Sequence, residues 1–245
     1  MSPALPALRY LLLQVRNPGD PMRAQEVQCF ADVLGCDPAR IAVHDLLGGA
    51  PTPGQLDRAD VVLLGGSGDY SVAEGGPWLE PALDGLRTLA ARAQPTFASC
   101  WGFQAVARAL GGTVVTDLDR AELGTLPVRL TDAGRADPVF GPLGPTFHAQ
   151  MGHQDVVTRL PEGAVRLAST DKVANQAFRL DGLPVYCTQF HPELGRATML
   201  GRLRAYPTYI ERILGLTVEQ FAETLADTPE TEALLPRFIR HVFSP

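Results

Sequence analysis

The chain has 245 residues, 45% of them hydrophobic, which is enough to bury one full α/β core and too few for two comfortable domains. Its formal net charge of -6 argues against non-specific nucleic-acid binding, which needs clustered Lys and Arg. The sequence shows neither a signal peptide nor an apolar run of about 20 residues, so we expect a cytoplasmic protein that does not span a membrane.

The first half of the chain alternates apolar strands with stretches of helical periodicity. The predicted elements are strand 9–15, helix 22–34, strand 40–43, strand 61–64, helix 78–93, strand 96–99 and helix 101–110. This alternation predicts an α/β fold with a doubly wound, mostly parallel open sheet and helices on both faces. From 113 to 189, short strands separated by Gly, Pro and Asp predict antiparallel strand excursions.

The last fifty residues show helical periodicity. It predicts helices over 199–214, over 218–225 with Thr217 as N-cap, and over 232–242. We therefore expect residues 1–196 to form one domain and residues 197–245 to form a C-terminal helical extension packed on it.

The heptapeptide ASCWGFQ, residues 98–104, closes a short buried strand and opens a helix. A side chain on such a tight strand-to-helix turn projects above a parallel sheet, and small neighbours two positions away on either side let the backbone bend. Ala98 and Gly102 occupy those positions around Cys100. The helix that follows adds partial positive charge, which favours the thiolate. Cys100 is therefore the candidate nucleophile.

A nucleophile needs a base and a group that orients the base. The segment 186–193, YCTQFHPE, is expected to deliver His191 at the end of a strand, and Pro192 stops that strand so that Glu193 turns back to the imidazole. Cys100, His191 and Glu193 then form a catalytic triad of nucleophile, base and orienting carboxylate.

Residues 61–70, VVLLGGSGDY, form an apolar strand that runs into a glycine-rich turn. Backbone amides in such a turn can face a ligand, so the turn is a candidate oxyanion hole together with the amide of Trp101, which follows the nucleophile. It lacks the Lys-Ser/Thr ending of a phosphate-binding loop.

Other residues of the same types are expected to be structural. Cys29, Cys36 and Cys187 are interpreted as buried hydrophobic side chains, and the four cysteines lack the paired CxxC spacing of a zinc site, so no metal is expected. The histidines interpreted as ordinary hydrogen-bonded residues are His44, His148 and His241.

These three motifs, in this order, resemble the class I, triad-type glutamine amidotransferases, over roughly residues 9 to 200. That family's elbow reads Gly-x-Cys-x-Gly-x-Gln, its strand-end motif Gln-Phe-His-Pro-Glu and its oxyanion loop Gly-Gly-Pro-Gly. Here Ala98 replaces the first elbow glycine and Ser67 replaces the loop proline, changes that a tight turn tolerates. The segments GHQDVV at 152–157 and LPEG at 160–163 are similar to the amidotransferase portion of GMP synthase and its stand-alone relatives.

The resemblance implies a reaction. Cys100 would attack the side-chain amide of glutamine, His191 would protonate the departing ammonia, and the γ-glutamyl thioester would be hydrolysed. Glu193 would orient His191, and the amides of Gly66 and Trp101 would form the oxyanion hole.

The resemblance also implies how the substrate is held. Gln104 and the backbone near Gln150 and Met151 would bind the amino-acid head of glutamine or of another γ-glutamyl compound. His153 matches a family position outside the triad. No cofactor is implied.

The sequence leaves the biological role open. In GMP synthase a nucleotide-binding synthetase domain follows the amidotransferase domain, and this chain is too short to contain one. It is therefore expected either to deliver ammonia to a separate synthetase, which we favour, or to act alone as a hydrolase of glutamine or of γ-glutamyl peptides. A cysteine hydrolase that lacks the His-Pro-Glu motif and a non-enzymatic binding module are disfavoured by the intact triad. A homo-oligomer stays open.

Overall fold

The strands at the centre of the molecule are buried on both faces. The computed structural model describes residues 7–243. Along the first strand, Tyr10 and Leu12 pack in one hydrophobic cluster, whereas Leu11 and Leu13 pack in another on the opposite side. Because successive side chains of a strand point to opposite faces, this continuous apolar run requires helices above and below the sheet.

The described residues form eleven strands and ten α-helices. The strands are β1 (Tyr10–Gln14), β2 (Ile41–Asp45), β3 (Val61–Leu64), β4 (Thr96–Ser99), β5 (Thr113–Thr116), β6 (Glu122–Leu130), β7 (Thr146–His153), β8 (Asp155–Arg159), β9 (Ala164–Ser169), β10 (Ala177–Leu180) and β11 (Val185–Thr188). The helices are α1 (Met22–Leu34), α2 (Pro53–Asp57), α3 (Leu79–Ala91), α4 (Trp101–Ala109), α5 (Asp132–Ala136), α6 (Arg196–Ala205), α7 (Pro207–Leu214), α8 (Val218–Ala222), α9 (Pro229–Glu232) and α10 (Leu234–Phe243).

Within residues 7–243, nine strands form one sheet in the order β2-β1-β3-β4-β11-β10-β9-β6-β7, and β5 pairs with β8 in a separate ribbon. The strands from β2 to β11 in this order run parallel, and those from β11 to β7 pair antiparallel. The α/β fold is confirmed. The antiparallel excursions expected between 113 and 189 extend the same sheet, so the sheet is mixed, with its parallel half at one end.

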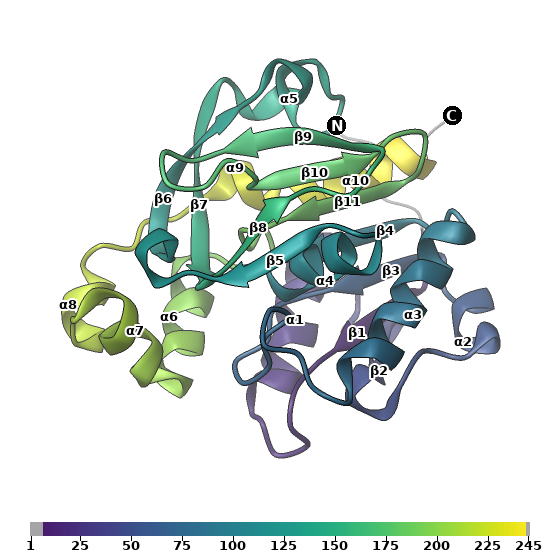
Figure 1. Ribbon diagram of the computed structural model, residues 1–245, viewed down its shortest axis with the longest axis horizontal. Helices are drawn as coiled ribbons and strands as arrows, with labels where there is room; N and C mark the ends of the chain where they lie inside the picture. Colours follow the sequence, from purple (N-terminus) through teal and green to yellow (C-terminus); the bar gives the residue numbers. More distant parts are fainter. Residues whose placement is uncertain (1–6, 244–245) are drawn as a thin grey trace.

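Helices cover the two faces of the sheet (Figure 1). Helices α1 and α10 contribute to the hydrophobic cluster on one face, and α3 and α4 contribute to the cluster on the other. Helices α6, α7 and α8 gather at one side of the molecule, and their apolar side chains form a third cluster around Phe221 and Ile210. The carboxyl ends of β3, β4 and β11 lie beside one another, where a doubly wound sheet binds its ligands.

Most element boundaries agree with the sequence prediction, but the predicted helix over 199–214 is wrong. The structure breaks it at Tyr206, whose φ of -126° and ψ of 61° are not helical, because Pro207 disfavours helical geometry in the residue before it. Two helices, α6 and α7, result. Thr217 caps α8 as predicted, since its side chain accepts a hydrogen bond from the backbone N–H of Gln220.

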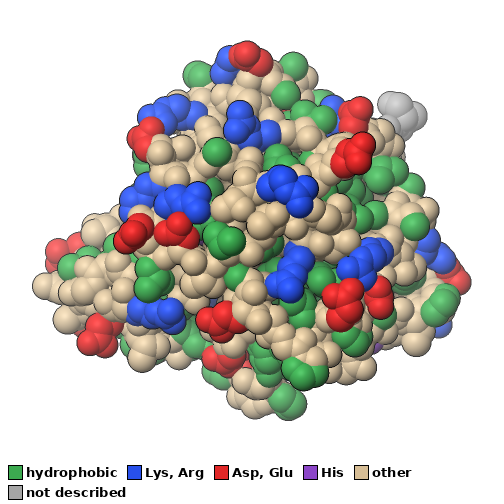
Figure 2. All heavy atoms as spheres, viewed as in Figure 1, with side chains coloured by type: hydrophobic (Ala, Val, Ile, Leu, Met, Phe, Trp, Pro, Cys, Tyr) green, Lys and Arg blue, Asp and Glu red, His purple; other side chains and the backbone are tan. Residues whose placement is uncertain are grey.

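The surface carries both signs of charge. Figure 2 shows acidic and basic side chains interspersed over the viewed face, without a large region of one sign. Among the described residues, the helices are too short or too polar for any of them to cross a bilayer.

Candidate active site

Cys100 lies on a strained turn between β4 and α4. Its φ of 50° and ψ of -104° lie in a region that side chains with a Cβ rarely adopt. A Cβ atom on Gly102 would lie 2.5 Å from Cβ of Leu64 and 3.2 Å from Cβ of Ala98, so this position has no room for a side chain. The elbow inferred from the heptapeptide is therefore present in the backbone.

His191 comes to Cys100 from the neighbouring strand. β11 pairs parallel with β4, with Thr188 opposite Ser99, and the backbone N–H of Cys100 donates to the carbonyl of Thr188 at 2.8 Å. His191 follows the end of β11, and its backbone N–H donates to the carbonyl of Gln150 at 3.0 Å. Adjacent parallel strands thus place the predicted nucleophile and base at the same edge of the sheet.

Glu193 holds the imidazole of His191. Nδ1 of His191 lies 2.6 Å from Oε1 of Glu193, and both side chains are buried. Burial alone would lower the pKa of His191, but the charges of Glu193 and Cys100 and hydrogen bonds to both raise it to about 9. Burial alone would raise the pKa of Glu193, but His191 and then Arg202 hold it below its usual range. The pair therefore favours a protonated His191 beside the carboxylate of Glu193.

The predicted oxyanion loop is clamped by a buried ion pair. Nε of Arg16 lies 3.2 Å from Oε2 of Glu26, and these side chains are 1% and 0% exposed. Glu26 accepts the backbone N–H of Gly66 at 3.2 Å, and Arg16 donates to the carbonyl of Gly66 at 3.0 Å. A Cβ on Gly65 would lie 2.1 Å from Oε1 of Glu26, so this close approach needs glycine. The amide of Gly66 must therefore turn away from Glu26 before it can serve an oxyanion.

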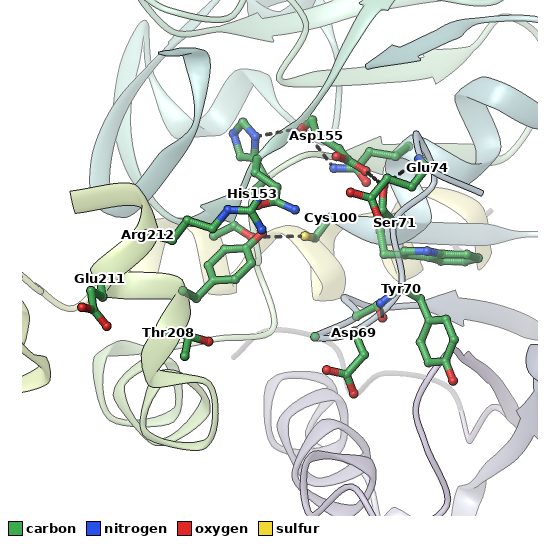
Figure 3. A pocket seen from close by; sticks show the side chains of 17 residues that line it. Asp69, Tyr70, Ser71, Glu74, Cys100, His153, Asp155, Thr208, Glu211 and Arg212 are labelled. Carbon is green, nitrogen blue, oxygen red and sulfur yellow. Dashed lines mark hydrogen bonds between the residues drawn. The ribbon is translucent and has the colours of Figure 1, made fainter. Parts of the chain in front are cut away.

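A cavity of about 510 Å³ opens beside the Cys100 thiol (Figure 3). Its size lies within the range of small-molecule pockets, about 300–1,000 Å³. Figure 3 shows Cys100 between the loop that carries Ser71 and Glu74 and the helix that carries Thr208 and Arg212. The lining comes from residues 67–71 and Glu74, from the elbow residues Cys100, Trp101 and Gln104, from residues 152–155, and from Thr208, Tyr209, Glu211 and Arg212 of α7.

Of the predicted substrate-binding residues, only Gln104 lines this cavity. Its side-chain amide donates to the carbonyl of Asp155 and to Oε1 of Gln189, both at 3.2 Å. Gln150 is buried and donates to the carbonyl of Ala226 at 2.8 Å, so it holds the C-terminal segment. Met151 is fully buried in the core. In this segment the lining of the cavity begins at Gly152, the residue after Met151.

His153 lies in the cavity wall with both ring nitrogens occupied. Nε2 lies 3.1 Å from Oε2 of Glu122, and Nδ1 lies 3.1 Å from the carbonyl of Asp155. The Asp155 carboxylate in turn accepts the hydroxyls of Ser71 at 2.6 Å and Thr116 at 2.7 Å. These contacts hold the cavity wall together and leave no free ring nitrogen for acid–base chemistry.

Sequence reasoning missed the contribution of α7. Tyr209 lines the cavity next to Cys100, and burial, followed by the charges of Cys100 and Asp155, raises the pKa of its hydroxyl. Arg212 and Glu211 stand at the rim and are exposed. The amphipathic pattern after Pro207 indicated a helix, but only the tertiary fold shows that this helix covers the site.

Across residues 7–243, no group of three or more His, Cys, Asp or Glu side chains is arranged to hold a metal ion. The four cysteines are free. Cys29 and Cys187 are buried, and burial raises the pKa of both thiols, to about 11 for Cys29. These two thiols therefore stay protonated near neutral pH.

The chain is similar to known proteins of one family. A family model described as glutamine amidotransferase class-I matches residues 38–200. The chain is 36% identical over 146 residues to a glutamine-hydrolysing GMP synthase of Christiangramia forsetii, covering 60% of this chain and 27% of that protein. It is 30% identical over 176 residues to the GMP synthase of Streptomyces avermitilis, covering 72% of this chain and 30% of that protein. The chain therefore spans less than a third of the length of these relatives.

Solved structures show the same fold. A glutamine amidotransferase from Thermotoga maritima superposes with a TM-score of 0.76 at 20% identity, over 97% of this chain and 99% of that chain. One from Methylobacillus flagellatus gives a TM-score of 0.68 at 20% identity, over 95% of this chain and 94% of that chain. Taken with the family match over residues 38–200, these findings show that the chain belongs to the class-I glutamine amidotransferase family of enzymes.

Proposed function

We propose that this protein hydrolyses the side-chain amide of L-glutamine through a γ-glutamyl thioester on Cys100 and releases ammonia for a separate synthetase. The observation that carries the proposal is the position of Cys100, on a strained turn between a substrate-sized cavity and the buried His191–Glu193 pair. A nucleophile, a proton carrier and a group that orients the carrier are thus combined at one cavity.

The chemistry follows from these positions. The Cys100 sulfur bonds to the side-chain carbonyl carbon of glutamine, and the tetrahedral intermediate expels its nitrogen as ammonia after Nε2 of His191 gives it a proton. A water molecule then gives a proton to Nε2 and its hydroxyl to the acyl carbon, which releases glutamate and the sulfur. Glu193 keeps Nδ1 occupied throughout, so that Nε2 stays the nitrogen that exchanges protons.

The oxyanion of both tetrahedral intermediates needs donors. The amide of Trp101 is the first of α4, and the first backbone N–H groups of a helix have no partner within the helix. The amide of Gly66 is the second proposed donor, once it leaves Glu26. Each donor of this kind contributes on the order of 10²–10³ in rate.

The fate of the ammonia is inferred from the relatives. The GMP synthases that match are described as glutamine-hydrolysing, and this chain corresponds to 27–30% of their length. In those relatives, the part that this chain does not match would contain the synthetase. We infer that a separate protein supplies that synthetase here and receives the ammonia from this chain. The same thioester chemistry would also cleave a γ-glutamyl peptide, whose acyl group is identical.

Release of glutamate and ammonia from L-glutamine by the purified protein tests the proposal. We expect turnover by the unchanged protein and its loss in Cys100→Ala, with the fold kept. Cys36→Ala is the matched control, since Cys36 is a partly buried free cysteine outside the cavity. Glutamine turnover that persists in Cys100→Ala, or its absence from the unchanged protein, would contradict the proposal.

A further inference from the structure

A second, much smaller cavity meets the first at Cys100. Its volume is about 40 Å³, and it lies between the catalytic residues and helices α6 and α7. Cys100 and Gly152 border both cavities, but His191 borders only the small one and Gln104 only the large one. Cys100 therefore lies where the two spaces meet, and His191 borders only the small one.

Helix α6 closes the small cavity. Met199 and Leu203 are 2% and 4% exposed and belong to the hydrophobic cluster of the C-terminal helices. Arg202 lies between them in the sequence, is 7% exposed, and donates from Nε to Gln25 at 3.2 Å. Its Nη1 and Nη2 atoms have no hydrogen-bond partner among the described residues. A buried guanidinium with two unused nitrogens indicates a site for a small polar molecule.

One of these guanidinium nitrogens, Nη1, and the ring of His191 face the same point. A Cβ atom on Gly66 would lie 2.8 Å from Cε1 of His191 and 3.7 Å from Nη1 of Arg202. Nη1 also lies 3.6 Å from Oε1 of Glu193. A molecule in this cavity would therefore be within reach of the imidazole on one side and of Nη1 of Arg202 on the other.

The reaction determines what enters this space. The nitrogen that leaves the substrate must lie within hydrogen-bond reach of Nε2 of His191, because that atom protonates it. The γ-glutamyl chain needs the large cavity, so the leaving nitrogen points into the small one. A volume of about 40 Å³ holds one or a few molecules of the size of water or ammonia, since one water needs about 10–15 Å³ by the same measure. An amino acid, which is the leaving group of a γ-glutamyl peptide and has at least about five non-hydrogen atoms, does not fit there.

Resting on the function proposed above, we propose that the small cavity is a leaving-group chamber whose wall on α6, formed by Met199, Arg202 and Leu203, restricts the leaving amine to ammonia. The C–N bond of the tetrahedral intermediate breaks toward this chamber, and ammonia accepts a hydrogen bond from Arg202 as it departs. Water then takes its place and attacks the thioester. These residues thereby decide between glutamine and γ-glutamyl peptides, which share their acyl group and differ in the amine.

The test compares kcat/KM for L-glutamine with kcat/KM for the dipeptide γ-glutamylglycine. In the unchanged protein we expect the dipeptide to be at least about 10²-fold poorer, since its leaving glycine is larger than the chamber. Leu203→Ala should narrow this ratio by about 10-fold or more by enlarging the chamber. Met199→Ala is the second variant should the first fold poorly, and a narrowed ratio in either one supports the proposal.

Leu225→Ala is the matched control. Leu225 is 6% exposed and lies in the same hydrophobic cluster, but it does not border the chamber. We expect it to leave the ratio unchanged. The proposal is overturned if the unchanged protein cleaves both amides equally well, or if neither enlarging variant narrows the ratio. Such results would leave Cys100-dependent glutamine turnover intact, whereas loss of that turnover would contradict the proposed function itself.

Discussion

Nδ1 of His191 lies 2.6 Å from Oε1 of Glu193, in a pair whose side chains are 4% and 0% exposed. The other carboxylate oxygen of Glu193 has no hydrogen-bond partner among the described residues. The orientation of the imidazole therefore depends on a single carboxylate oxygen. Because this contact occupies Nδ1, it leaves Nε2 as the nitrogen that serves Cys100.

Glu193→Gln should lower kcat for glutamine hydrolysis by on the order of 10²–10⁴-fold, because the amide no longer enforces the required tautomer. His191→Asn and Cys100→Ala should lower kcat further, since they remove groups that exchange a proton or form the thioester. Steady-state kinetics of the three variants near neutral pH measure this ranking. A Glu193→Gln variant with full kcat would contradict the assigned role.

The pH dependence follows from the pKa of His191, which is raised from 6.5 to about 9. A raised pKa keeps the imidazole protonated until the pH approaches that value, and acylation uses this proton to release ammonia. We therefore expect kcat/KM to fall as the pH rises through about 9. The pair also stabilises the folded state fully below pH 6.5, and this contribution is lost as the pH rises through the folded pKa.

Glu193→Gln provides the control for that profile. Removal of the negative charge that raises the pKa of His191 should move the alkaline limb toward lower pH. A profile of kcat/KM against pH for both proteins measures the shift. An alkaline limb at the same pH in the variant would show that another group controls it.

Gly66→Ala should damage catalysis more than folding. The added methyl group would lie 2.8 Å from Cε1 of His191, so the imidazole must move away from Cys100. We expect a loss of kcat/KM of about 10²-fold, since a displacement of about 1 Å in a catalytic group has this effect. Gly48→Ala is the matched control, because nothing lies within 4 Å of its Cβ position. Equal activity of the two variants would contradict the predicted crowding.

The buried pair of Arg16 and Glu26 predicts a large effect on stability. Glu26→Ala removes the carboxylate that neutralises the buried guanidinium of Arg16. We expect this to lower the free energy of unfolding by about 3–5 kcal/mol. Glu80→Ala, which removes an exposed ion pair with Arg87, should cost no more than about 1 kcal/mol. Urea denaturation followed by circular dichroism compares the two. Similar midpoints would contradict the role assigned to the buried pair.

Local patterns were enough to predict much of the fold. The apolar run over 61–64 and the helical spacing over 22–34 appear in the structure as β3 and α1 with the same boundaries. The elbow was predictable because Cys100 stands between two small residues at a strand-to-helix junction, a constraint that is local in sequence. Pro207 was the missed local signal, since it divides a continuous helical periodicity into α6 and α7.

The rest of the site depends on contacts that a single sequence does not specify. The family resemblance placed Gln150 at a substrate-binding position. In the structure its side-chain amide instead donates a hydrogen bond to the carbonyl of Ala226 in the C-terminal segment. Tyr209 and Arg202 reach the site only because α6 and α7 pack over it, and a helical pattern says nothing about where a helix docks. Likewise, the contact of Glu26 with Gly66 joins residues forty positions apart.

In the proposed mechanism, Cys100 carries the γ-glutamyl group during turnover. Acid quenching of the protein during reaction with L-glutamine, followed by intact mass measurement and peptide mapping, detects that thioester directly. We expect a γ-glutamyl adduct on the peptide that contains Cys100, and none in Cys100→Ala. Glutamate formation by the unchanged protein and Cys100→Ala at equal rates, with no adduct on Cys100, would contradict it.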